Sequence, residues 1–232
     1  GGFSLVPQYI GESAKSDLFG TNFLFNRDGT SVAGQIDQNY ATFVDEANVT
    51  TIRFPGGTLA ETRLDLSNPD SLNANFMEPG YEAVDPTVPL SSFLDFCASA
   101  NAAATLVLPT YRFLTDEPDG SGHRGIDTSE EANLRSYIQF AVSKAGELGT
   151  KISAFEIGNE WYVDNSATFG FRMSPVEYGR IVNYMSAIIE EEINSYEQAG
   201  GSTVDDPAIV VQIGPGGAME QFTPQGFRPP ED

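Results

Sequence analysis

Hydrophobic residues along the chain follow two different periods. Short, nearly continuous apolar runs have the length of buried strands, and between them apolar residues recur every three or four positions, as in amphipathic helices. The predicted strands are 20–25, 51–54, 104–109, 152–160 and 208–213. The predicted helices are 38–47, 90–98, 128–148 and a long one that begins near residue 174. Apolar strands separated by helices indicate an α/β fold with a parallel sheet.

Several segments carry local signals for helix ends or connections. Ser174–Glu177 has capping-box spacing with a proline at the first helical position, and Thr128–Glu131 repeats that spacing. Gly149 is suited to end the helix that Thr128 would start. A polar connection rich in Asn, Asp and Pro is predicted from Gly57 to Pro89, and a Gly/Asp/Pro loop is predicted around His123.

Two parallel-sheet architectures fit this pattern, a doubly wound sheet and a (β/α) barrel of the TIM type. No glycine-rich phosphate fingerprint follows the first strand, and polar residues gather at the ends of several strands, so the barrel is favoured. Five strands are used by Ile213, and too few residues remain for three more strand–helix units. We therefore expect one domain over residues 1–232, an incomplete barrel with about five parallel strands, as the N-terminal fragment of a longer protein.

Composition narrows the possible partners. The formal charge of the 232 residues is −21, which argues against nucleic acid and anionic membranes as partners. No apolar run is long enough to span a bilayer. Cys97 is the single cysteine and lies in an apolar pattern, so a buried thiol is expected, and with one histidine no metal site is predicted. High acidity is compatible with secretion but leaves the compartment open.

Candidate chemistry gathers at two strand ends. The fourth run stops at Asn159, Glu160 and Trp161, and the second run carries Arg53 just before Pro-Gly-Gly. Enzymes with parallel barrels place their catalytic groups at the carboxyl ends of the strands. A carboxylate delivered there predicts catalysis by Glu160. The alternative is a surface or salt-bridged carboxylate at the start of a loop.

These two segments, Ile52–Gly57 and Ile157–Trp161, resemble the retaining glycoside hydrolases of clan A, in particular arabinofuranosidases and heparanase-like glucuronidases. The resemblance covers the five predicted strands. It implies that Glu160 is the general acid/base, that Asn159 binds the sugar 2-hydroxyl, and that Arg53 lies near the nucleophile. It implies a poly- or oligosaccharide substrate and no cofactor.

Each supporting residue also has a purely structural interpretation. Asn159 could satisfy a turn, and Arg53 could form an ion pair that closes the end of the barrel. Asn22 and Tyr111, at the ends of the first and third strands, are predicted to contact sugar but fit packing or turn roles equally. Trp161 could be a stacking platform for a sugar ring, although a lone tryptophan is more commonly buried in the core.

The chain departs from the family pattern in one respect. Retaining hydrolysis needs a second carboxylate about 5 Å from the first as nucleophile, and in this clan it lies on a seventh strand that the chain lacks. We therefore expect the isolated chain to be inactive. Two other hypotheses stay open: a carbohydrate-binding module or pseudoenzyme, and a structural half-barrel that self-associates or pairs with the missing half, because open strand edges favour association.

Overall fold

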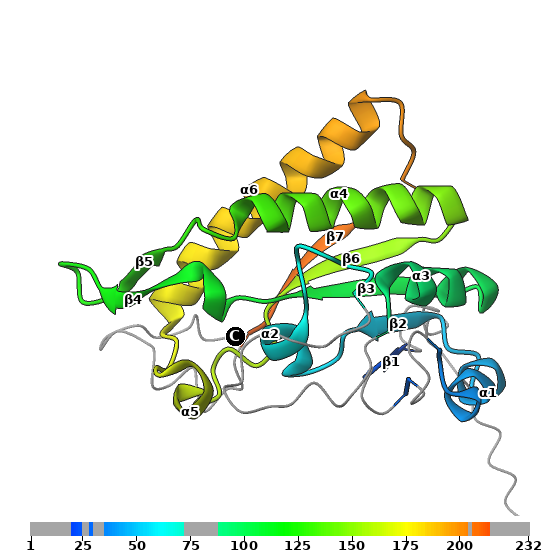
Figure 1. Ribbon diagram of the computed structural model, residues 1–232, viewed down its shortest axis with the longest axis horizontal. Coiled ribbons are helices and arrows are strands. Elements are labelled where there is room, and N and C mark those ends of the chain that lie inside the picture. The colour runs from blue at the N-terminus through cyan, green and yellow to red at the C-terminus, as the bar shows by residue number, and fades with distance from the viewer. Residues whose placement is uncertain (1–19, 25–27, 30–34, 72–87, 204–205, 214–232) are drawn as a thin grey trace, which may run out of the picture.

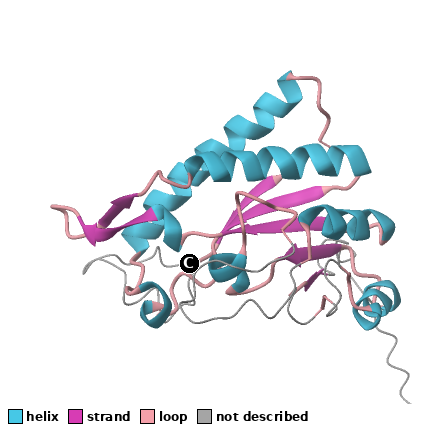
Figure 2. Cartoon of the chain, viewed as in Figure 1, coloured by secondary structure: helices cyan, strands magenta, loops and turns pink. Residues whose placement is uncertain are grey.

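The computed structural model describes residues 20–24, 28–29, 35–71, 88–203 and 206–213. Its main sheet consists of β1 (Gly20–Asn22), β2 (Thr51–Phe54), β3 (Ala103–Leu108), β6 (Ile152–Ile157) and β7 (Ala208–Val211). The helices are α1 (Gln38–Glu46), α2 (Leu59–Arg63), α3 (Leu90–Ser99), α4 (Glu131–Leu148), α5 (Ser166–Phe169) and α6 (Pro175–Gln198). Figures 1 and 2 show the sheet with α3, α4 and α6 alongside it.

The five strands of this sheet are all parallel, and their order in space is their order along the chain, β1-β2-β3-β6-β7. Sequential order without a reversal is how strands succeed one another in a (β/α) barrel, whereas a doubly wound sheet reverses direction at a switch point. The prediction of an α/β fold with five parallel strands in an incomplete barrel is confirmed (Figure 1).

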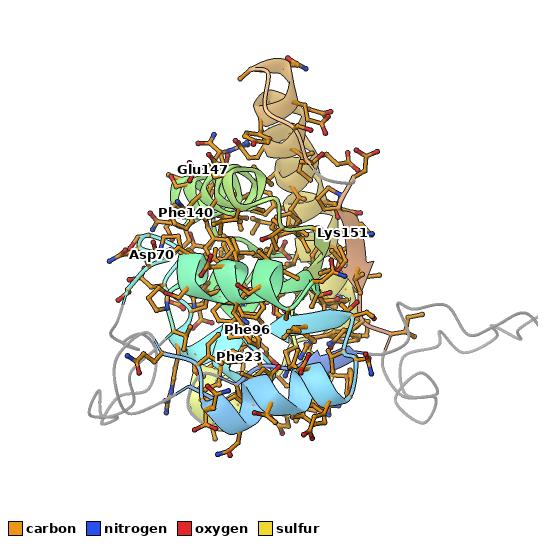
Figure 3. All side chains as sticks on the ribbon, turned by 90° about the vertical axis from the view of Figure 1, so that its right-hand side faces the viewer. Phe23, Asp70, Phe96, Phe140, Glu147 and Lys151 are labelled. Atoms are coloured by element: carbon orange, nitrogen blue, oxygen red, sulfur yellow. The ribbon has the colours of Figure 1, made fainter. Side chains whose placement is uncertain are left out.

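Helices α3, α4 and α6 lie on one side of the sheet and bury its apolar face (Figure 3). Phe54 of β2 stacks on Phe23 and on Phe93, with ring centroids 5.9 Å and 4.4 Å away. On α4 and α6, the predicted apolar stripes are buried in the same core. Cys97 is buried there, as predicted. No helix among the described residues is long and apolar enough to cross a membrane.

The opposite face of the sheet carries the polar residues. Side chains alternate along a strand, so Ile52 and Phe54 point toward the helices while Arg53 points the other way. Val107 lies opposite Glu156, and Glu156 lies opposite Val210, in the register of β3, β6 and β7. The inner face therefore brings Arg53 and Glu156 toward the carboxyl end of the sheet.

Some local predictions were wrong. His123 does lie in a loop, at residues 119–123, but that loop joins two strands that were not predicted, β4 (Leu114–Pro118) and β5 (Arg124–Ile126), which form an antiparallel hairpin after a 3₁₀ turn at Tyr111–Phe113. The polar connection after β2 contains α2, while its residues 72–87 lie outside the described part of the chain. Thr128 is not an N-cap, because α4 begins at Glu131 and its N-cap Glu130 makes no side-chain capping bond.

Other local predictions were confirmed, with shorter strands. Ser174 and Glu177 form the reciprocal capping box at the start of α6, with Pro175 inside the first turn. Gly149 ends α4 in the left-handed conformation, at φ 68°. β1 and β6 end at Asn22 and Ile157, before the predicted strand ends, and Phe25 lies outside the described residues.

Candidate active site

The turn after β6 presents Glu160. Gly158 has φ 78° and Glu160 has φ 46°, so the chain passes twice through the left-handed region within three residues. That region is easy for glycine and costly for glutamate. A Cβ on residue 158 would also lie 2.8 Å from Cγ2 of Thr110, so only glycine fits there. This tight exit from the strand leaves the Glu160 side chain exposed at the carboxyl end of the sheet.

Arg53 joins three polar side chains beside this turn. Its Nε donates to Oε2 of Glu156 at 2.5 Å, and its Nη2 donates to Oε1 of Glu156 and to Oδ1 of Asn159, each at 3.0 Å. Its Nη1 reaches Oδ1 of Asn22 at 3.3 Å. Glu156 and Asn159 are both buried. A charge-assisted, bidentate pair with Arg53 holds Glu156 in place, and one further bond from the same guanidinium holds Asn159. The predicted residues Asn22, Arg53 and Asn159 are therefore brought together.

Glu156 is the carboxylate that Arg53 binds. The sequence analysis did not name it as a site residue, although it shares the strand parity of Glu160. The ion pair that was one of the two interpretations of Arg53 is present, with side-chain exposures of 19% for Arg53 and 7% for Glu156. Alternation along a strand is the signal that places both groups on the inner face.

Gln212, just beyond β7, is a site residue that the sequence analysis missed. Its Nε2 donates to Oε1 of Glu156 at 2.6 Å, and its Oε1 accepts from the backbone N–H of Glu160 at 2.5 Å. A glutamine at the end of an apolar run, two positions after Val210 and so on the same face, was the available signal. Gln212 thus links the ion pair to the Glu160 turn.

Trp161 and Tyr111 lie beside this turn and are both buried. The indole of Trp161 stacks on Tyr178 with centroids 4.6 Å apart, and its Nε1 donates to the carbonyl of Gln212 at 2.9 Å. The hydroxyl of Tyr111 donates to the carbonyl of Trp161 at 3.3 Å. Tyr111 also stacks on Phe169, with centroids 4.3 Å apart. In this structure both rings pack against protein, and their predicted sugar contacts remain predictions.

A buried carboxylate supports the neighbouring turn after β3. Glu61 of α2 is 1% exposed and accepts hydrogen bonds from the backbone N–H groups of Thr110 and Tyr111 and from the Thr110 hydroxyl. Burial raises the pKa of Glu61, against the opposing effects of these hydrogen bonds and of Arg112. No sequence signal pointed to Glu61, because it lies in a segment predicted to be a connection.

Metal chemistry has no support among the residues that the structure describes. No group of three or more His, Cys, Asp or Glu side chains there is arranged to hold a metal ion. The site therefore offers an exposed carboxyl group, a fixed amide and a guanidinium already paired with a carboxylate. This set can exchange a proton with a bound molecule and hydrogen-bond its hydroxyl groups.

The comparisons with known proteins concern structures alone, since no protein-family model and no curated protein matches the sequence. A xyloglucanase of glycoside hydrolase family 44 from Paenibacillus polymyxa is similar at 14% identity and TM-score 0.41, over 84% of this chain and 40% of that one. A β-1,4-D-mannanase from Cryptopygus antarcticus is 15% identical, with TM-score 0.40, over 83% and 55% of the two chains.

A third structure is a family 51 α-L-arabinofuranosidase from Bifidobacterium longum, at 11% identity and TM-score 0.30, over 92% of this chain and 59% of that one. These neighbours are glycoside hydrolases. The chain spans 40% of the xyloglucanase and 59% of the arabinofuranosidase.

Proposed function

We propose that this chain supplies the acid/base half of a retaining glycoside hydrolase that acts on a poly- or oligosaccharide. The observation that carries the proposal is the placement of Glu160 at the carboxyl end of β6, exposed, beside an amide that Arg53 holds in place. In this role Glu160 protonates the leaving glycosidic oxygen and then removes a proton from the attacking water.

Asn159 is proposed to bind the substrate next to the scissile bond. Its Oδ1 is occupied by Arg53, at 3.0 Å, which fixes the orientation of the amide. The Nδ2 group on the other side of the amide is then the donor offered to a sugar hydroxyl. A hydrogen bond to the 2-hydroxyl that strengthens in the transition state contributes to glycoside hydrolysis. Asn22, bonded to the same guanidinium and exposed, is proposed to extend this contact.

The nucleophile is proposed to lie outside the described residues. Glu156 is a poor candidate because its carboxylate already accepts from Arg53 and from Gln212. Its side chain is also only 7% exposed, so both oxygens are turned to protein groups and not to a bound sugar. Arg53 would then act on the nucleophile through the end of its guanidinium that contacts Asn22.

The test compares Glu160→Gln with the unaltered form, both in the full-length protein, in hydrolysis of a panel of polysaccharides and their oligosaccharides. Glu190→Gln on the exposed face of α6 is the matched control, because it removes one carboxylate without touching the site. We expect the first variant alone to lose turnover, with unchanged substrate binding. Undiminished turnover by Glu160→Gln would refute the assignment, and sugar binding without turnover by the natural protein would favour a binding module.

A further inference from the structure

Every polar group of Gln212 is hydrogen-bonded to a residue on or beside the turn that carries Glu160. Its backbone N–H donates to the Tyr178 hydroxyl at 2.9 Å, and its carbonyl accepts from Nε1 of Trp161 at 2.9 Å. Its side-chain oxygen accepts from the Glu160 N–H, and its side-chain nitrogen donates to Glu156. The main-chain bonds fix the end of β7 against Trp161 and Tyr178, and the side chain spans the inner face.

We propose that Gln212 is a positioning residue that fixes the direction of the Glu160 carboxyl. This inference rests on the proposed function, because it assigns to Gln212 the orientation of the acid/base. Gln212 lies at the end of a different strand from Glu160, so the turn after β6 is held from outside its own strand. The function proposed above does not require such a residue.

The chemistry of this position favours a primary amide. The side chain must donate toward a carboxylate at one end and accept from an N–H at the other, and both bonds are short, at 2.6 Å and 2.5 Å. An ionised glutamate lacks the donor and a lysine lacks the acceptor. The glutamine therefore couples the Arg53–Glu156 pair to the backbone of Glu160.

The backbone of Glu160 explains why an external bond is needed. A non-glycine residue at φ 46° occupies a conformation that persists only when the surroundings hold it there. The hydrogen bond from its N–H to Gln212 is a direct contact with that residue. Loss of this bond would let the turn relax toward ordinary φ values, and the carboxyl would move with it.

The first experiment replaces Gln212 by methionine, which keeps length and packing and removes both side-chain bonds. Gln139→Met is the matched control, because Gln139 also donates to a glutamate, Glu192, but between α4 and α6 away from the site. Amide hydrogen exchange of Glu160, followed by NMR in the 232-residue chain, reports the bond without any need for activity. We expect exchange at Glu160 to accelerate about tenfold in Gln212→Met only, with amides of β6 unchanged.

The same substitutions are then introduced into the full-length protein, and its kcat and KM are compared with those of the natural form. Because small displacements of a catalytic group can cost about 100-fold in rate, we expect kcat to fall on that scale in Gln212→Met while KM changes little. A role in fold stability alone would lower the melting temperature but leave kcat per folded molecule unchanged when turnover is measured well below that temperature. Gln139→Met should leave both constants unchanged.

Gln212→Glu keeps the size and shape of the side chain and introduces a carboxyl group. Its protonation state can be changed with pH within the same variant. The introduced carboxyl faces Glu156 of β6, whose partner is Arg53 of β2, and lies beside the Glu160 backbone and the Tyr178 hydroxyl of α6. Two adjacent carboxyl groups share one proton, so the bond to Glu156 survives at low pH and is lost by repulsion when both ionise. We expect the protection of the Glu160 amide, its exchange rate relative to that of the natural chain at the same pH, to be close to natural at low pH and to fall as pH rises.

The two proposals fail separately. Faster Glu160 exchange in both variants without hydrolysis by any form supports the positioning contact and refutes the glycosidase. Unchanged Glu160 exchange in Gln212→Met overturns the positioning role, whatever the turnover. Should Gln212→Met fail to fold, a Glu160 exchange rate in Gln212→Glu that equals the rate in the natural chain at every pH would overturn it equally.

Discussion

Arg53 and Glu156, 103 positions apart in the sequence, form a bidentate ion pair across the inner face of the sheet. The pair connects β2 to β6 past the intervening β3. Its guanidinium also binds Asn159, the residue beside Glu160. The pair is therefore a structural element of the fold and the support of the candidate site at once.

Removing one partner of this pair should destabilise the chain strongly. Arg53→Met leaves the Glu156 carboxylate buried without its cation, and breaking buried pairs in this way costs about 3–5 kcal/mol. We expect a loss near the lower end of that range in urea unfolding, because Arg53 is 19% exposed. The double variant Arg53→Met with Glu156→Gln should recover part of the lost free energy of unfolding, because no unpaired carboxylate is then buried.

The control for this prediction is Lys144→Met, which breaks the exposed Lys144–Glu147 pair on α4. Exposed pairs contribute about 0–1 kcal/mol, so the loss should be small. Equal losses for the buried and the exposed pair would contradict the account of the site.

Gly158 should tolerate no side chain, for two separate reasons. The first is its left-handed backbone conformation at φ 78°, which is unfavourable for alanine. The second is steric, because the alanine Cβ would lie 2.8 Å from Cγ2 of Thr110. Gly170→Ala is the matched control, since Gly170 has φ 79° and open space around it. We expect Gly170→Ala to cost about 1 kcal/mol from backbone conformation and Gly158→Ala to cost about 1–3 kcal/mol more from overpacking.

Thermal unfolding measures both costs. Adding Thr110→Ser to Gly158→Ala removes the clashing methyl group and should restore part of the difference. Identical losses for the two alanine variants would show that Thr110 does not constrain the turn that leads to Glu160.

Glu61 predicts a pH-dependent contribution to stability. Because burial raises the pKa of Glu61 above its ordinary value of 4.5, the native state holds its proton more tightly than the unfolded state does. That stability is complete below about pH 4.5 and is lost as pH rises through the native pKa. Glu61→Gln, whose amide faces the donors of Thr110 and Tyr111, should cost about 1–3 kcal/mol at low pH.

Urea unfolding of Glu61→Gln and of the natural chain across pH tests this sign. The difference between their free energies of unfolding should shrink as pH rises, because only the natural chain loses the Glu61 contribution. Glu147→Gln, at an exposed position on α4, should run parallel to the natural chain. A difference that grows with pH would contradict the raised pKa.

The outer edge of β7 predicts self-association of the 232-residue chain. Among the described strands, β7 pairs only with β6, and Val210, Val211 and Ile213 are 39%, 44% and 76% exposed. Exposed apolar edge strands favour association. Sedimentation velocity should show concentration-dependent association that Val211→Lys with Ile213→Lys weakens, and a strict monomer would contradict this prediction.

The sequence predicted the elements whose signals are local. Strand 51–54 and the capping box at Ser174 follow from residues within a few positions of each other. The hairpin 114–126 was missed because its strands are mostly polar and only Leu114 is buried, so no alternation of hydrophobic residues marks them. The helix boundary at Thr128 was wrong because spacing alone does not decide where capping geometry forms.

The candidate site could be predicted only in part for a related reason. Asn159 and Glu160 are adjacent in sequence at a strand end, and that position alone pointed to them. The contacts of Arg53 with Glu156, and of Gln212 with Glu160, join residues 103 and 52 positions apart. Such contacts depend on register across neighbouring strands, which one sequence does not encode in a readable pattern.

The most direct test of the central claim is the dependence of Glu160→Gln on the leaving group. Hydrolysis of an unactivated oligosaccharide needs the general acid. In an aryl glycoside of an acidic phenol, the phenolate departs without being protonated. We predict that Glu160→Gln lowers cleavage of the first substrate about 10²–10⁴-fold, with far less effect on release of the phenol in the first turnover. Equal losses on both substrates, or none on either, would contradict the assignment of Glu160 as the proton donor.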